Sequence, residues 1–170
     1  MPKLLVVFSS IDAYAAHTAD VVAAGAKSVR FTEVDVRTVA DENVDVSDRR
    51  RLASFETLHD YDGVIRVGPG PESLGHELGA LLAWLSKADS LSDTVFGAAG
   101  EENGDMLMGI ARSGGLMVAQ PRGADAEDRA RKLGIRVAKV IGWVRHALGH
   151  EAEHSREHSH HHNVNSHDLH

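Results

Sequence analysis

The sequence of 170 residues contains no cysteine. This absence excludes disulfides, thiol catalysis and metal or iron–sulfur sites with cysteine ligands. No apolar run approaches the roughly 18 residues of a membrane span, and the N-terminus lacks the basic and hydrophobic regions of a signal peptide. We therefore expect a cytoplasmic protein without a membrane span.

Positive charge is also scarce. The chain has 18 Lys and Arg residues against 25 Asp and Glu residues, so its formal net charge is −7 at pH 7. No long run of Lys and Arg is present, and the neutralisation of nucleic-acid phosphates requires concentrated positive charge. We expect no nucleic-acid partner. The hydrophobic content of 42% suffices for the core of a single domain.

Short β-like runs alternate with amphipathic segments through most of the chain. The runs that predict strands lie at residues 3–8, 31–36, 63–67, 94–96 and 116–119. Helices are predicted between them, with apolar residues at helical spacing, and each connection is long enough for a right-handed crossover. The sequence therefore predicts an α/β fold with a doubly wound parallel sheet of five strands.

The last predicted helix has the clearest pattern. Asp125 suits an N-cap, and one face carries an apolar stripe made of Leu133, Val137, Val140, Ile141, Val144 and Leu148. Gly149 is expected to interrupt this helix. Trp84 and Trp143 are expected to pack against helices, although a partly exposed tryptophan would suit a partner surface.

The connection after the first predicted strand suits a phosphate. An aliphatic strand leads there through a short loop into a helix, whose free N–H groups and positive dipole end favour an anion. Ligands of doubly wound sheets bind beyond the carboxyl ends of the strands, where the strand order reverses. Loops at residues 9–14, 69–74 and 98–104 would meet at that edge. A turn of small residues would also be needed there without any ligand.

Residues in several of these segments match the residues that a known protein family has at the same positions. Between residues 3 and 39 they are Lys3, Ser10, Ala19, Gly25, Ala26, Val29, Glu33 and Val34. Further along they are the segment Tyr61-Asp62-Gly63-Val64-Ile65, then Pro69, Val95, Phe96 and Gly100. In these positions the chain resembles the flavodoxin-like NAD(P)H:quinone oxidoreductases of the tryptophan-repressor-binding-protein family. The resemblance covers roughly residues 1–147.

The resemblance implies a flavodoxin-like fold with strand order 2-1-3-4-5 and FMN as the cofactor. The cofactor-binding residues that it implies are Ser10, Ile11, Asp12, Ala13, Tyr14, Ala15, Pro69, Gly70, Pro71, Glu72, Ala98, Ala99, Gly100, Glu101, Glu102 and Asn103. It further implies an enzyme that passes electrons from the nicotinamide cofactor NAD(P)H to a quinone-like acceptor. No side chain stands out as a catalytic acid, base or nucleophile, so the flavin would supply the hydride chemistry.

The chain departs from the family in its loops. Asp12 stands beside the expected phosphate, where a carboxylate repels the anion and costs on the order of 1 kcal/mol. Residues 70–72 lack the cation and the aromatic ring that the family places against the flavin. The family's long insertion before the last helix is reduced to residues 120–124. Because that insertion supports the family's tetramers, a homo-oligomer is allowed by the resemblance but not carried over from it.

Histidines concentrate at the C-terminal end. Nine of the 12 lie between residues 146 and 170, including His146, His150, His154 and His158 at a spacing of four and the triplet His160, His161 and His162. On a helix this spacing aligns imidazoles that can share a zinc, nickel or copper ion. We expect a flexible His-rich tail at 148–170, outside a flavodoxin-like domain at 1–147. The alternative to an oxidoreductase is a flavin-less binding module whose tail sequesters metal, and a solvated extension without metal also remains open.

Overall fold

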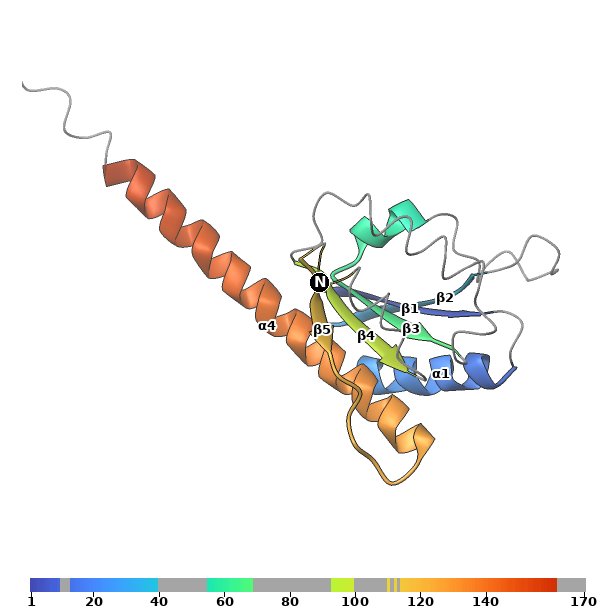
Figure 1. Ribbon diagram of the computed structural model, residues 1–170. Helices are drawn as coiled ribbons and strands as arrows, with labels where there is room; N and C mark the ends of the chain where they lie inside the picture. Colours follow the sequence, from blue (N-terminus) through green and yellow to red (C-terminus); the bar gives the residue numbers. More distant parts are fainter. Residues whose placement is uncertain are drawn as a thin grey trace, which may run out of the picture.

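The body of the protein is a parallel sheet of five strands (Figure 1). The structure is a computed structural model that describes residues 1–9, 13–39, 55–68, 93–99, 110, 112 and 114–161, with the side chains of the last helix described as far as His150. The strands are β1 (Lys3–Ser9), β2 (Glu33–Val39), β3 (Gly63–Val67), β4 (Val95–Ala99) and β5 (Leu116–Val118). Their order is β2-β1-β3-β4-β5 and every pairing is parallel, which confirms the predicted fold.

Two strands differ from their predicted bounds by more than one residue. β2 begins at Glu33 because Phe31 occupies the preceding turn with a φ of 65°. β4 continues to Ala99, so Ala98 and Ala99 belong to a strand rather than to a loop. All five residues of this strand are buried, and small side chains fit where packed elements lie close. The predicted helix at 51–58 is a 3-10 helix, η2 (Phe55–Asp60). Those predicted at 74–85 and around 106–111 fall mostly outside the described residues.

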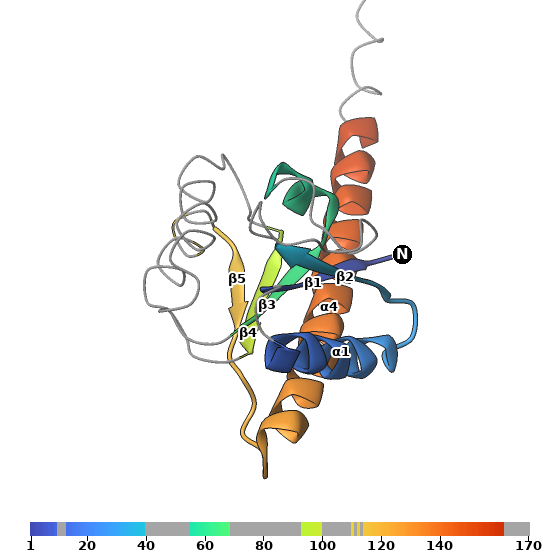
Figure 2. The ribbon, with the colours of Figure 1, turned by 90° about the vertical axis from the view of Figure 1, so that its right-hand side faces the viewer.

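Two helices, α1 (Ala13–Lys27) and α4 (Ala126–His161), lie side by side on one face of the sheet (Figures 1 and 2). Alternate strand residues point toward them, since successive side chains of a strand point to opposite faces. The resulting core contains Leu4, Val6, Phe8, Ile65 and Val67 from the sheet and Val22, Leu133, Val137 and Ile141 from the helices. The core therefore holds α1 and α4 as one layer.

Glycines allow α1 and α4 to touch through their backbones. A Cβ atom on Gly134 would collide with the carbonyl oxygen of Val22, and one on Gly25 would collide with the carbonyl oxygen of Arg131. Only a residue without a side chain fits at either position. The two glycines thus set how closely the helices approach.

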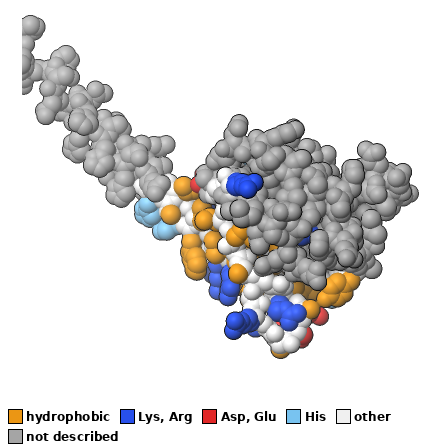
Figure 3. All heavy atoms as spheres, viewed as in Figure 1, with side chains coloured by type: hydrophobic (Ala, Val, Ile, Leu, Met, Phe, Trp, Pro, Cys, Tyr) orange, Lys and Arg blue, Asp and Glu red, His pale blue; other side chains and the backbone are white. Residues whose placement is uncertain are grey.

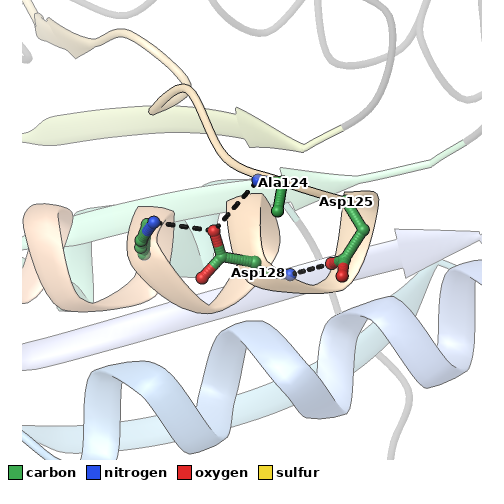
Figure 4. Close-up of polar contacts among 4 residues, drawn as sticks. Ala124, Asp125 and Asp128 are labelled. Atoms are coloured by element: carbon green, nitrogen blue, oxygen red, sulfur yellow. Dashed lines mark hydrogen bonds and ion pairs between the residues drawn. The ribbon is translucent and has the colours of Figure 1, made fainter.

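The start of α4 is capped as predicted (Figure 4). The N–H of Asp128 donates to Oδ1 of Asp125 over 2.7 Å, which satisfies one of the free donors of the first turn. Oδ2 of Asp128 accepts from the N–H of Ala124 over 3.4 Å and from Nζ of Lys132 over 2.7 Å. The hydrogen bond from the Lys132 ammonium holds the pKa of Asp128 below its ordinary value.

The prediction that Gly149 interrupts the last helix is wrong. α4 runs through this position to His161 and extends well beyond the sheet (Figure 1). A glycine inside a helix costs only about 1 kcal/mol relative to alanine, which the surrounding helix can absorb. Before α4 extends beyond the sheet, Arg145 forms an ion pair in which its Nε lies 2.7 Å from Oδ1 of Asp62. Among the described helices, none has the length and apolar character that a membrane span requires.

The contact between the helices yields a stability prediction. We expect Gly134→Ala to lower the free energy of unfolding by about 1–3 kcal/mol, because the new methyl group forces α1 and α4 apart. The matched control is Gly142→Ala in the same helix, where nothing lies within 4 Å of an added Cβ. That variant gains helix propensity and should be up to about 1 kcal/mol more stable. Urea denaturation measures both, and equal effects at the two positions would contradict the packing.

Candidate functional site

The candidate site lies at the carboxyl edge of the sheet. Three of the strands end there at Ser9, Val67 and Ala99, and their pairing brings these ends level. The strand order reverses between β1 and β3, because the chain passes from β1 outward to β2 and then back to β3 on the other side. Doubly wound sheets bind their ligands at such a reversal. All three predicted loops begin at this edge.

The first turn of α1 supplies the described part of the predicted phosphate site. Ala13, Tyr14 and Ala15 form this turn, whereas the sequence analysis placed Ala13 and Tyr14 in a loop. Tyr14 is 62% exposed and Ala15 is buried. The turn contains no acidic residue, and the first N–H groups of a helix lack intrahelical acceptors. Together with the helix dipole, this geometry favours an anion.

The other predicted flavin residues divide into two groups. Ala98 and Ala99 are buried in β4, and the carbonyl of Ala99 accepts a hydrogen bond from the N–H of Gly68 over 3.2 Å. They can form the floor of a site but offer it no polar side chain. The remaining predicted residues lie outside the described part of the chain: Ser10, Ile11, Asp12, Pro69, Gly70, Pro71, Glu72, Gly100, Glu101, Glu102 and Asn103.

A buried hydroxyl near this edge was not anticipated from the sequence. Thr38 of β2 pairs in register with Phe8, one residue before the strands end, and is only 1% exposed. Among the described residues, its Oγ1 has no hydrogen-bond partner. An unsatisfied buried polar atom costs about 1–3 kcal/mol, so a polar group that reached it would be bound favourably. The location of Thr38 near this edge follows from the pairing of β2 with β1, which the sequence alone does not show.

A second polar cluster joins β2 to the start of β3. The hydroxyl of Tyr61 donates to Oδ2 of Asp35 over 2.8 Å, and a guanidinium nitrogen of Arg37 lies 3.5 Å from the same oxygen. Burial raises the pKa of Tyr61, and the hydrogen bond to Asp35 and its charge raise it further, while Arg37 acts in the opposite direction. The sequence offered no signal for this cluster, because Tyr61 precedes β3 and lies 26 residues from Asp35 of β2.

Of the predicted histidine stripe, the side chains of the first two members are described. His146 and His150 are exposed on successive turns of α4, and their Nε2 atoms lie 3.1 Å apart. Two nitrogens bound to one tetrahedral zinc ion at about 2.0–2.1 Å lie roughly 3.3–3.4 Å apart. Within the described residues, no group of three or more metal-ligating side chains gathers. His154, His158, His160 and His161 continue along the helical backbone, and His162 lies outside the described residues.

Comparisons with known proteins define the class of the fold. No protein-family model matches the chain, and no curated protein sequence does. Among solved structures, a short-chain flavodoxin associated with a non-canonical PDU bacterial microcompartment is similar at a TM-score of 0.57 and 14% identity, over 83% of this chain and 99% of that one. A diflavin flavoprotein A3 from Nostoc sp. is similar at 0.55 and 16%, over 88% and 97%.

A flavone reductase is also similar, at a TM-score of 0.60 and 13% identity, and the match covers 85% of this chain and 65% of that one. The strand order of this chain and its likeness to these structures show a flavodoxin-like fold. At such low identity the likeness concerns the fold alone. Function therefore has to be argued from the residues of this chain.

The tyrosine cluster yields a prediction about pH. The chain has two tyrosines, so Tyr14→Phe leaves Tyr61 as the sole phenol to titrate. Its raised pKa means that the folded state favours the neutral phenol. The stability that this preference contributes is present below the ordinary pKa of about 10 and is lost as the pH rises through the folded pKa.

We expect Asp35→Asn in the Tyr14→Phe background to lower the pKa of Tyr61, because the charge of the carboxylate is removed while burial remains. Absorbance of the tyrosinate measures the midpoint. An unchanged midpoint would show that burial alone accounts for the raised pKa of Tyr61.

Proposed function

We propose that the protein binds FMN and acts as an oxidoreductase that passes electrons from NAD(P)H to a small quinone-like acceptor. The observation that carries this proposal is the position of the α1 N-terminus. It lies at the edge of the sheet where the strand order reverses between β1 and β3. The short-chain flavodoxin and the diflavin flavoprotein of similar fold support the same class of cofactor.

The described residues fit the phosphate of FMN. The first turn of α1 is free of acidic side chains, and its N–H groups point to the edge where the strands end. The unsatisfied Oγ1 of Thr38 adds a polar group near that edge. In this proposal Ser10 and the backbone of residues 10–15 hold the phosphate, and the loops at 69–74 and 98–104 enclose the ring.

The protein's own contribution would be positioning. When bound, FMN would supply the hydride and electron transfer, for which no acid or base of this chain is required. The buried strands β1, β3 and β4 would provide a rigid floor, and the exposed Tyr14 offers an aromatic side chain beside the phosphate. The nicotinamide cofactor and the acceptor would then approach the flavin from solvent.

Titration with FMN tests the proposal. We expect saturable quenching of FMN fluorescence, and Asp12→Asn should tighten binding by about 1 kcal/mol or less, because it removes a negative charge beside the phosphate. Asp20→Asn is the matched control, since Asp20 is exposed about two turns further along α1 and should leave the affinity unchanged. If neither form binds FMN at about 1 mM, the flavin proposal fails.

A second candidate function rests on the two exposed histidines of α4. We infer that His146 and His150 chelate a zinc, nickel or copper ion, because their Nε2 atoms already lie 3.1 Å apart. The helical backbone continues the stripe through His154 and His158. Neutral imidazole is the ligand, so binding should weaken as the pH falls below about 6.5. The protein would then be a metal-binding module, with or without a flavin.

Trp143 offers a reporter for this site because it precedes His146 by three residues on the same exposed side of α4. We expect copper(II) to quench the Trp143 fluorescence, with His146→Ala or His150→Ala weakening the effect about tenfold, because the histidine pair nearest Trp143 is reduced to a single ligand. His17→Ala serves as the control, since His17 is an exposed histidine of α1. Equal quenching curves for all variants would rule out a chelate at this pair.

A further inference from the structure

A basic groove of about 430 Å³ lies between the loop after β5 and the outer face of α4. Four cationic side chains line it together with an indole ring and an aliphatic side chain: Arg122, Lys132, Arg136, Lys139, Trp143 and Ile135. Figure 3 shows Lys and Arg side chains gathered along this part of the surface, with hydrophobic side chains beside them. Of the residues that the structure describes, no predicted flavin residue and no predicted metal ligand lines the groove.

The segment that forms most of the groove is positively charged, whereas the rest of the chain is negatively charged. Residues 122–145 contain seven Lys and Arg residues and three Asp and Glu residues, a net charge of +4. The other residues therefore carry a net charge of −11, since the whole chain carries −7. Such a concentration of positive charge attracts anions to one place on an otherwise acidic protein.

Several of the cations have donors available. Lys132 pairs with Asp128 over 2.7 Å, and Arg136 donates to the carbonyl of Ala119 over 3.4 Å, so each retains further N–H groups. No side-chain hydrogen bond or ion pair of Arg122 or Lys139 is found in the described part of the chain. Their positive charges are thus only weakly compensated, apart from the Asp128 carboxylate beside Lys132.

Trp143 is exposed at one end of the groove. Its side chain was predicted to pack against a helix, but it is 69% exposed. Lys132, Arg136, Lys139 and Trp143 are spaced by four, three and four residues, so they follow one face of α4 over about 16 Å. An aromatic surface at one end and cations along the remainder match a ligand with an aromatic ring and a chain of phosphates.

We propose that this groove binds a nucleoside diphosphate or triphosphate, with the base stacked on Trp143 and the phosphates held by Lys139, Arg136 and Arg122. A groove of this volume suits a small ligand. A long polyanion such as nucleic acid would be repelled by the net charge of −11 on the rest of the chain. Inorganic phosphates have no aromatic ring, so they would make no stacking contact with the exposed indole of Trp143.

Calorimetric titration of the full-length protein with ADP tests the proposal, with pyrophosphate and a poly-glutamate peptide as comparison ligands. We expect saturable binding of ADP, tighter than that of either comparison ligand. Lys139→Glu should weaken ADP binding about tenfold, because the substitution places a negative charge against the phosphates. Trp143→Ala should remove most of the preference for ADP over pyrophosphate.

Arg30→Glu is the matched control. Arg30 is exposed in the turn between α1 and β2, does not line the groove, and its substitution changes the net charge by the same amount. The ADP affinity of the Arg30→Glu variant should stay within about twofold of that of the unsubstituted protein at moderate salt. The proposal is overturned by equal weakening in both charge reversals, by no saturable ADP binding up to about 5 mM, or by tighter binding of pyrophosphate or poly-glutamate. The outcome is independent of whether FMN binds at the carboxyl edge.

Discussion

The backbone contact between α1 and α4 is the constraint on which the other features depend. Gly25 and Gly134 leave no room for a side chain between the helices, so the two are fixed as one layer over the sheet. This placement directs the N-terminus of α1 to the edge where the strands end. It also decides which face of α4 is buried, and therefore which face carries the groove and the histidines.

α4 has a different environment on each side and along its length. Its inner stripe, with Leu133, Val137 and Ile141, belongs to the core, while its outer face carries cations and Trp143. Further along, Arg145 pairs with Asp62, which directly precedes β3. Beyond this pair the helix has no sheet to cover, so polar and metal-ligating residues can occupy every face. A single helix thus contributes to the core, to a basic groove and to a candidate metal site.

The candidate sites were predictable to different degrees. The spacing of His146 and His150 indicated a shared face, because a helix repeats after nearly four residues whatever lies beside it. The basic groove was missed because its cations alternate with core residues in the sequence and Arg122 comes from a preceding loop. Likewise, the hydrogen bond between Tyr61 and Asp35 depends on strand register, which a single sequence does not reveal.

Local patterns in the sequence determined the alternation of strands and helices, the N-cap at Asp125 and the inner stripe of α4, since each depends on near neighbours along the chain. That alternation predicted the parallel sheet, and the family resemblance implied its strand order. The tertiary structure alone decided that β4 includes Ala98 and Ala99, that α4 passes through Gly149 and that Trp143 is exposed. These outcomes depend on what packs against each residue, and packing partners distant in the sequence outweigh local propensity.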